Sequence, residues 1–561
     1  MAARNDVADP LRRSLACRPG LMLGLAAASL LVACQSTPDT AANAGPATLS
    51  ADDAARCQAL VGQTLGGARI ERVDLVRRGQ KGGRNLFGSS KAEVPFCKVH
   101  AVGSSAPGSS IRMEFFLPGS WNGKLMGVGG GGLSGGLSGS TGALMPELAR
   151  GYAGVANDAG HTDEKRAAWA LNAPARIEDF GFRANHAAAL AAKAVVAAYY
   201  GRPVDKSYFS ACSNGGRDAL MLAQRYPADY DGIIAGAPAL NWTGVMVAAQ
   251  AYHQTYKRTP GAERLPAKLG MVREAVMRKC DRLDGVVDDV LENPLACDFD
   301  PGELACTEGQ TGDRCLTAGE VQVARTIYGG LHTASGERII HGFPVSSEHG
   351  RAVIPIVGWA PWFLNGLEAG LKLSTDFFRG LVHQDLDWDP ETFDLDKDYA
   401  LAVARTGAAL DAKNPDLRAF TERGGKLLIF HGWEDSALPA GDTLAYYEAA
   451  RAAVGAGADD SVRLFMAPGM AHCSLGHGPD TLNLTPVIDA WVTRSEAPTS
   501  ILAEKQEKGL LQLMGRPGRT LRTRPLCPWP QTARYRGTGS TDEAANFTCE
   551  APTPAGRSAA R

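Results

Sequence analysis

The sequence predicts an α/β fold in which a parallel sheet carries helices on its faces and is interrupted by a large inserted segment. From about residue 110 to residue 245, short apolar stretches typical of strands alternate with stretches of helical spacing. The alternation stops between about residues 246 and 420 and then returns. We therefore expect one α/β domain, formed by residues 56–245 and 421–561, with an inserted lid domain over residues 246–420.

The segment that precedes this domain is typical of an export signal. Basic residues up to Arg18 are followed by the apolar run 21–33, which is shorter than the roughly 20 residues of a membrane-spanning helix. Residues 31–34 resemble a bacterial lipoprotein signal, which predicts removal of residues 1–33 and lipidation of Cys34 as the mature N-terminus. By the same resemblance, Gln35 favours an anchor in the outer membrane.

Export is the common expectation of both interpretations of this segment. The alternative to lipidation is a plain signal peptide that is cleaved nearby, so the expected locations are the periplasm, the outer membrane as a lipoprotein, or the extracellular medium. Residues 34–55 are rich in Ser, Thr, Pro and Ala, and this composition predicts a flexible tether.

Composition excludes several classes of protein. The net charge of −2 gives no basic excess, so no nucleic-acid partner is expected. Hydrophobic residues make up 45% and charged residues 21%, which is ordinary for a globular protein and too apolar for a disordered one. Beyond the N-terminus no apolar run is long enough to indicate a polytopic membrane protein.

The cysteine count agrees with export. Of 12 cysteines, Cys17 belongs to the signal and Cys34 is assigned to lipidation, which leaves an even number in the mature chain. In an oxidising compartment an even number predicts a set of disulfides. A zinc site is the alternative, but no C-x-x-C or paired ligand spacing supports it.

The expected elements of the α/β domain follow one another in the order that a parallel sheet requires. The predicted strands are 112–117, 124–128, 152–156, 207–211, 232–235, 426–430 and 462–466, and the predicted helices are 186–200, 218–225 and 443–454.

A short motif between the strand at 207–211 and the helix at 218–225 predicts a catalytic nucleophile. The residues Ala-Cys-Ser-Asn-Gly-Gly at 211–216 resemble the nucleophile elbow, G-x-S-x-G, of α/β-hydrolases, with Ser213 as the nucleophile. The turn is so tight that small residues are needed two positions before and after the serine. Gly215 meets this need, whereas Ala211 departs from the usual glycine by one methyl group.

An acid and a histidine follow at the ends of two later strands, in the order Ser–Asp–His that this fold uses. Asp435 follows the strand at 426–430 and His472 follows the strand at 462–466. A neutral His472 could take the proton of Ser213 while Asp435 fixes its tautomer. Glu434 and His477 are the nearest alternatives for the acid and the base.

The Gly-rich run 127–132 predicts part of an oxyanion hole. The backbone N–H of Asn214 should supply one donor, and Gly131 or Gly132 the other, because glycine lets a backbone approach a bound carbonyl. The same run also matches G-x-G-x-x-G, a dinucleotide fingerprint. That motif needs a helix directly after the third glycine, but a Gly- and Ser-rich stretch follows.

Together these motifs resemble the tannase and feruloyl esterase family of secreted serine esterases, over nearly all of the mature chain. The resemblance rests on seven further stretches: 157–161 (NDAGH), 179–183 (DFGFR), 200–203 (YGRP), 212–217 (CSNGGR), 223–227 (AQRYP), 236–239 (GAPA) and 431–435 (HGWED), with His472-Cys473 closing the series. It implies an α/β-hydrolase fold with a large lid and a triad of Ser213, His472 and Asp435.

The resemblance also implies how the cysteines pair. Cys212, directly before the serine, is expected to bond to Cys473, directly after the histidine. The other implied pairs are Cys57–Cys97, Cys280–Cys297, Cys306–Cys315 and Cys527–Cys549.

Four aspartates between residues 281 and 289 form a candidate metal site. Clustered carboxylates suit Ca²⁺, although the register is not that of an EF-hand and such clusters are more often solvated loops. The resemblance implies a structural Ca²⁺ that is held by the side chains of Asp281, Asp284 and Asp288 and by the carbonyls of Val286 and Val290.

The expected function is hydrolysis of esters of aromatic acids, such as galloyl, feruloyl or terephthaloyl esters, through an acyl-enzyme. The lid is expected to supply apolar and aromatic contacts, although for each of its aromatic residues Phe377, Phe378 and Trp388 taken alone a place in the core is the favoured interpretation. The alternative is a non-catalytic, calcium-stabilised surface lipoprotein that keeps the fold for binding. The sequence does not predict an oligomeric state.

Overall fold

The computed structural model describes residues 46–551, apart from 86–87, 163–164, 309, 311, 313, 350–356, 366–368 and 508–517. The predicted signal peptide and Cys34 therefore lie outside the described residues, as does most of the predicted tether. The end of that tether is wrong as predicted, because residues 51–55 belong to helix α1 (Ala51–Ala59). The Ser50 side chain accepts a hydrogen bond from the backbone N–H of Asp53 and so caps this helix.

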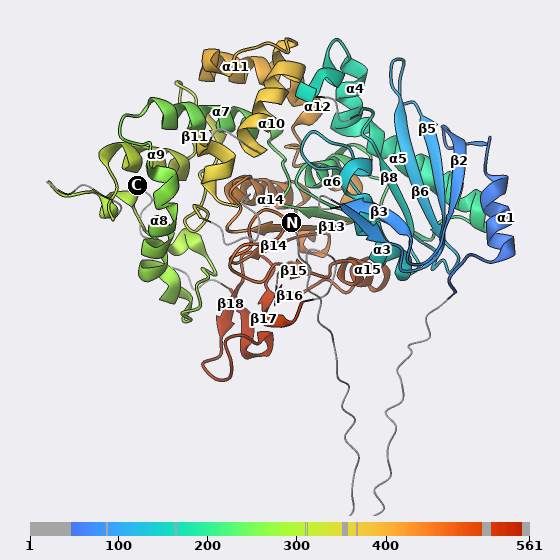
Figure 1. Ribbon diagram of the computed structural model, residues 1–561. Coiled ribbons are helices and arrows are strands. Elements are labelled where there is room, and N and C mark those ends of the chain that lie inside the picture. Colours follow the sequence, from blue (N-terminus) through green and yellow to red (C-terminus); the bar gives the residue numbers. More distant parts are fainter. Residues whose placement is uncertain are drawn as a thin grey trace, which may run out of the picture. The chain divides into compact units, whose positions relative to one another are not determined.

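A mixed sheet forms the centre of the described chain (Figure 1). Its strand order is β1-β2-β5-β6-β8-β7-β9-β10-β13-β14. The strands are β1 (Thr64–Leu65), β2 (Ala68–Val76), β5 (Phe96–Gly103), β6 (Ile111–Pro118), β8 (Ala153–Asn157), β7 (Lys124–Gly127), β9 (Lys206–Cys212), β10 (Gly232–Gly236), β13 (Lys426–Gly432) and β14 (Val462–Ala467). From β8 to β14 neighbouring strands are parallel, and from β1 to β8 along the sheet they are antiparallel.

Helices cover both faces of the parallel strands, and the sequence alternates accordingly. Ile233 and Leu427 point to the face that packs against α5 (Ala184–Tyr200), α6 (Asn214–Arg225) and α14 (Ala440–Val454). The next residues, Ile234 and Leu428, point to the opposite face, which packs against α3 (Leu144–Ala149) and α15 (Thr485–Arg494). Because successive side chains of a strand point to opposite sides, these strands are apolar throughout.

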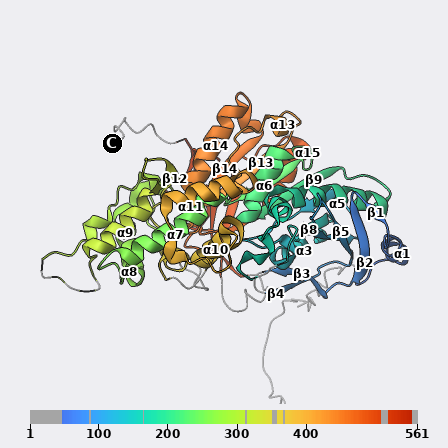
Figure 2. The same ribbon diagram turned by 90° about the horizontal axis from the view of Figure 1, so that it is seen from above.

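The segment predicted as the lid is mainly helical and lies beside the sheet in both ribbon views (Figures 1 and 2). Phe377, Phe378 and Trp388 are buried in an apolar core that this segment shares with residues of the α/β domain such as Phe180 and Leu438. These aromatics are therefore core residues. The helices are α7 (Trp242–Arg258), α8 (Leu265–Cys280), α9 (Ala318–Gly329), α10 (Ala369–Phe377), α11 (Leu395–Ala402), α12 (Ala408–Leu410) and α13 (Arg418–Thr421), with a short hairpin of β11 (Leu331–His332) and β12 (Arg338–Ile340).

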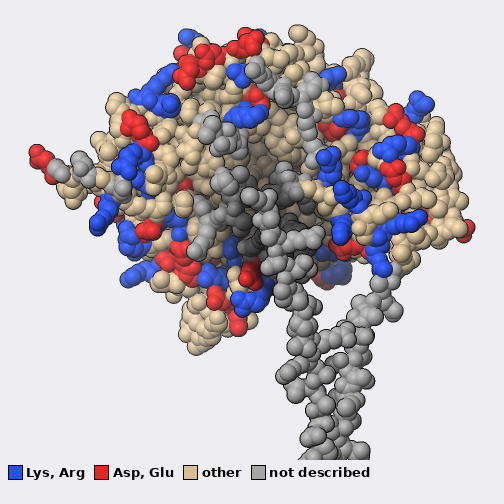
Figure 3. Space-filling model, in the orientation of Figure 1, with Lys and Arg blue, Asp and Glu red and all other residues tan. Residues whose placement is uncertain are grey.

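The remaining elements are short helices and small sheets. They are α2 (Gly136–Gly139), α4 (Pro174–Glu178), the hairpin of β3 (Lys81–Asn85) and β4 (Gly88–Lys91), the three-stranded sheet of β15 (Thr481–Leu482), β16 (Ile501–Gln506) and β17 (Thr520–Leu526), and the pair β18 (Thr532–Tyr535) and β19 (Phe547–Glu550). Lys, Arg, Asp and Glu are intermixed over the face that Figure 3 shows. Within the described residues, no helix is both long and apolar enough to cross a bilayer.

Candidate active site

Ser213 lies in a sharp turn between β9 and α6, where its backbone has φ of 65° and ψ of −125°. This positive-φ conformation is strained for any residue with a side chain. The crowding around the turn explains the glycine that follows: a Cβ on Gly215 would lie 2.5 Å from the Cβ of Ala211 and 2.9 Å from the carbonyl oxygen of Gly130. With Ala211 in place of the usual glycine, only glycine fits at position 215.

A fully buried arginine fixes the start of α6. The Arg217 guanidinium donates to the Asn214 side-chain oxygen at 2.7 Å, to the carbonyls of Phe180 and Gly181, and to Asp218 at 2.7 Å. These contacts join the stretch 212–217 to the stretch 179–183. The side chain of Asn214 is thus held inside the protein.

The structure brings the three residues predicted as a triad together. His472 lies in the loop after β14, and its Nε2 is 2.9 Å from Ser213 Oγ. Its Nδ1 is 2.8 Å from Oδ2 of Asp435, in the loop after β13. An ionised carboxylate can only accept, so Nδ1 carries the proton and Nε2 is free to accept from the Ser213 hydroxyl. His472 is 20% exposed, whereas Asp435 is fully buried, so only the histidine end of the pair faces solvent.

Asp435 is held by several donors. Its Oδ1 accepts from the backbone N–H groups of Ala437 at 2.8 Å and Leu438 at 3.0 Å. Burial alone would raise the pKa of this carboxyl, but the charge of His472 and the hydrogen bonds from His431 and His472 outweigh burial and hold the pKa below its ordinary value. Asp435 is therefore an anion at neutral pH.

Glu434 and His477, the alternative acid and base, pair with each other. His477 Nδ1 is 2.7 Å from Glu434 Oε2, and Arg273 of α8 donates to Glu434 Oε1 at 3.3 Å. Arg273 also donates to Asp289 at 2.7 Å. This buried group joins the loops after β13 and β14 to α8, and the hydrogen bond from Ser213 goes to His472 instead.

Five disulfides are present with the implied pairing. Cys212 and Cys473 are bonded directly beside the serine and the histidine. The others join Cys57 to Cys97, Cys280 to Cys297, Cys306 to Cys315 and Cys527 to Cys549. The Cys212–Cys473 bond connects the end of β9 to the loop after β14, although the two cysteines are 261 positions apart in the chain.

The Gly-rich loop after β7 packs against the start of α6. The backbone N–H of Gly130 bonds to the carboxylate of Asp218, so it is already used. Gly131 is exposed with open space where a Cβ would stand, and Gly132 has φ of 57°. Only a turn and the four-residue helix α2 follow, so the long helix of a dinucleotide site is missing from this described stretch.

One aromatic residue of the lid reaches the candidate site. The ring centroid of Trp362 lies 6.0 Å from that of His472, with the two rings nearly perpendicular. Trp362 is only half-buried, unlike the core aromatics of the same segment. It places an apolar ring beside the candidate base.

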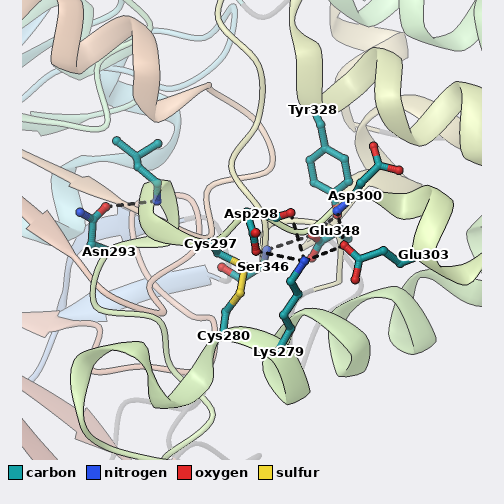
Figure 4. The surroundings of a disulfide bond; sticks show 11 residues. Lys279, Cys280, Asn293, Cys297, Asp298, Asp300, Glu303, Tyr328, Ser346 and Glu348 are labelled. Atoms are coloured by element: carbon teal, nitrogen blue, oxygen red, sulfur yellow. Dashed lines mark hydrogen bonds and ion pairs between the residues drawn. A yellow bond between two sulfur atoms is a disulfide. The ribbon is translucent and has the colours of Figure 1, made fainter. Parts of the chain in front are cut away.

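The acidic loop at 281–289 lies in the segment that is closed by the Cys280–Cys297 disulfide. Figure 4 shows this disulfide and its surroundings. Both carboxylate oxygens of Asp281 and of Asp284 accept backbone N–H groups, and Asp288 pairs with Arg522 at 3.2 Å and with Arg524. Burial, and then the charges of Asp288 and Asp281, raise the pKa of Asp284 to about 6. Hard oxygen donors thus lie close together here, although no three acidic, His or Cys side chains of the described residues converge as a ready metal site.

Comparison with known proteins identifies the chain. The model of the family described as "Tannase and feruloyl esterase" matches residues 97–550. The chain belongs to this family. Mono(2-hydroxyethyl) terephthalate hydrolase of Piscinibacter sakaiensis is 34% identical over 503 residues, which cover 79% of this chain and 82% of that protein. A probable feruloyl esterase of Arthroderma benhamiae is 32% identical over 454 residues, covering 77% and 81%.

Solved structures agree with the tannase and feruloyl esterase assignment. A crystal structure of an esterase from Aspergillus oryzae has a TM-score of 0.79 at 25% identity and covers 88% of this chain and 99% of its own. Feruloyl esterase B from the same organism has a TM-score of 0.79 at 24% identity, covering 89% and 100%, and shows the shared fold. The α/β-hydrolase fold is thus confirmed. This family member is a carboxylic-ester hydrolase, and the alternative of a non-catalytic lipoprotein is set aside.

Sequence reasoning missed three residues of the esterase site. Arg217 and His431 lie within stretches that carry the family resemblance, but spacing alone gives them no role. Trp362 was one of several aromatics in the lid, and only its lower burial separates it from the core set.

Proposed function

We propose that this esterase hydrolyses esters of aromatic acids with Ser213 as nucleophile, His472 as general base and Asp435 as the orienting acid. The observation that carries the proposal is the continuous chain of contacts from Ser213 Oγ through His472 to Asp435, at 2.9 and 2.8 Å. Such distances permit proton transfer between the nucleophile and its base.

The steps follow from this geometry. Ser213 Oγ attacks the ester carbonyl while its proton passes to His472 Nε2, and His472 then gives that proton to the departing alcohol. Water then attacks the acyl-enzyme while its proton passes to the same nitrogen, and His472 returns that proton to Ser213 Oγ as the acid is released. We assign the oxyanion hole to the backbone N–H groups of Asn214 and of Gly131 or Gly132, because the N–H of Gly130 is bonded to Asp218.

Two observations support an aromatic acyl group: the contact of the lid residue Trp362 with His472, and the names of the relatives. The Trp362 ring, 6.0 Å from the His472 ring, offers a face or edge against which a flat acyl group can pack. Two relatives are named for their action on a terephthalate monoester and on feruloyl esters. Feruloyl, galloyl and terephthaloyl esters are therefore the substrate classes to test.

Replacement of the nucleophile tests the proposal. For Ser213→Ala we expect a loss of kcat of at least about a thousandfold on methyl ferulate, methyl gallate, mono(2-hydroxyethyl) terephthalate and p-nitrophenyl acetate, because no acyl-enzyme can form. Ser210→Ala, in the same strand, is the matched control and should keep its activity. Wild-type rates in Ser213→Ala would contradict the mechanism.

A structural Ca²⁺ at the acidic loop is also proposed. The donor chemistry supports this ion: the carboxylates of Asp281, Asp284 and Asp288 and the carbonyls of Val286 and Val290 are hard oxygen donors, and burial together with the neighbouring carboxylates raises the pKa of Asp284. When bound, the ion would neutralise this cluster and hold the loop beside the Cys280–Cys297 disulfide.

Export with lipidation at Cys34 completes the proposal. It is supported by the sequence of residues 1–34 and by five disulfides, which persist in oxidising compartments. An outer-membrane lipoprotein is the favoured location, with periplasmic or extracellular release as the alternatives. Membrane fractionation of wild type and Cys34→Ser checks this, since a lipid anchor requires the thiol.

A further inference from the structure

A second histidine contacts the acid of the proposed triad. His431, on β13, is fully buried, and its Nε2 is 3.2 Å from Asp435 Oδ2 and 3.2 Å from the carbonyl oxygen of Leu438. Its Nδ1 is 2.8 Å from the hydroxyl of Thr443 on α14. The same carboxylate oxygen is 2.8 Å from Nδ1 of His472, so Oδ2 lies between two imidazoles.

The partners of His431 determine where its proton is. A carboxylate and a carbonyl can only accept hydrogen bonds, so Nε2 must carry a hydrogen. The Thr443 hydroxyl can donate, and when it donates to Nδ1 the imidazole is neutral. A neutral ring also avoids a second buried cation beside Asp435 when His472 becomes imidazolium during catalysis.

We propose that His431 is a positioning residue of the active site, which rests on the triad proposed above. As a neutral imidazole it donates its Nε2–H to Asp435 and Leu438, and so holds the carboxylate where Oδ2 meets Nδ1–H of His472. Together with the N–H groups of Ala437 and Leu438, it completes a set of donors that fixes both carboxylate oxygens.

The groups around this site define what a pH experiment would report. Two histidines face Asp435: His472, which lies in the loop after β14, and His431, which lies in β13. The side chain of α14 that contacts His431 is the neutral Thr443. The neighbouring Glu434 is paired with His477 and Arg273. Without the hydrogen bond from His431, the negative charge of the Asp435 carboxylate would be less well stabilised. Proton binding by Asp435 and by the neighbouring His472 would then be favoured.

The test compares His431→Leu with His431→Gln, whose amide N–H can replace the lost donor. We expect His431→Leu to lower kcat on p-nitrophenyl acetate about 10- to 100-fold with KM changed less than about threefold, and to slow labelling of Ser213 by a fluorophosphonate to the same degree. The acid limb of kcat/KM should move to higher pH. His431→Gln should recover most of the rate and the wild-type limb.

The outcomes separate this proposal from the proposed function. Wild-type rates and an unmoved acid limb in folded His431→Leu would overturn the role of His431 while Ser213→Ala remains inactive. The proposal would also be overturned if His431→Leu and His431→Gln lost the same fraction of kcat and this loss matched the fall in Tm of each variant. Such a result would indicate a purely structural role. Full activity of Ser213→Ala would instead remove the triad itself.

Discussion

Ser213 and its neighbours show how little room the nucleophile turn leaves. The positive φ of the serine projects its hydroxyl out of the turn, and Ala211, Gly215 and Gly130 are packed beneath it. The extra methyl of Ala211, which departs from the usual motif, is accommodated because position 215 has no side chain. The two positions are therefore coupled.

This coupling predicts a compensation. Gly215→Ala should strongly reduce activity and lower Tm, because its Cβ would lie 2.5 Å from that of Ala211. The double variant Ala211→Gly/Gly215→Ala removes that contact and should recover part of both losses, with the remaining deficit due to the Gly130 carbonyl at 2.9 Å. Melting curves and esterase rates of the single and double variants check this; identical losses in both would refute the coupling.

The depressed pKa of Asp435 predicts how the site contributes to stability. A carboxyl whose folded pKa lies below its unfolded value stabilises the folded state at every pH above the unfolded value of about 4, and loses this contribution as pH falls toward the folded pKa. The Tm deficit of Asp435→Asn should therefore be largest at pH 5–8 and shrink toward pH 3. A deficit that does not change with pH would contradict the assignment.

At the scale of elements, the parallel half of the sheet could be predicted because its strands are short apolar runs. The predicted strands from 112–117 to 462–466 and the predicted helices 186–200, 218–225 and 443–454 all match elements of the structure within a few residues. The antiparallel extension by β1, β2 and β5 was not predicted, and the strand predicted at 112–117 is β6, which pairs antiparallel with β5 and β8 and does not belong to the parallel half. β5 alternates buried and half-buried residues, a weak signal that becomes a strand only through its pairing with β2 and β6.

The site could be predicted only to the level of loops. Strand order placed an acid and a histidine at neighbouring strand ends, but both Glu434 and Asp435 occupy the first loop, and His472 and His477 occupy the second. Spacing cannot say which pair faces the serine. The directions of the side chains determine which pair faces the serine. These directions depend on the turns and on partners such as Arg273 of α8, which donates to Glu434.

The bond between the turn after β9 and the loop after β14 gives an element-scale prediction. Cys212→Ala/Cys473→Ala should lower stability by at most about 5–6 kcal/mol in the chain-entropy description and should also reduce kcat, because the loops that carry Ser213 and His472 lose their tether. Cys306→Ala/Cys315→Ala, which opens a bridge of sequence separation 9 within the lid, is the control and should keep its kcat. Unchanged kcat in the first variant would separate the bond from catalysis.

At the scale of the whole molecule, the acidic loop and the residues after it connect the lid to two C-terminal strands, β17 and β18. Asp288 pairs with Arg522 and Arg524 of β17, and Glu292 accepts from the backbone N–H of Ala533 in β18. A cation at this loop would therefore stabilise contacts between segments far apart in the chain.

Chelation tests this effect. EGTA should lower Tm by several degrees, and added Ca²⁺ should restore it, because a ligand that binds only the folded state stabilises it. Asp284→Asn should have a lower Tm and respond little to EGTA, whereas Asp298→Asn, an exposed aspartate of the same region, should respond as wild type does. No response of the wild type to EGTA would contradict the calcium site.

The Cys212–Cys473 bond also has a consequence for proteolytic cleavage of the lid. The whole lid lies between the two cysteines, so a protease that nicks it produces two fragments that remain covalently joined. Ser213 and His472 would stay on opposite sides of the same bridge. The protein could thus lose backbone continuity in the lid while Ser213 and His472 remain assembled.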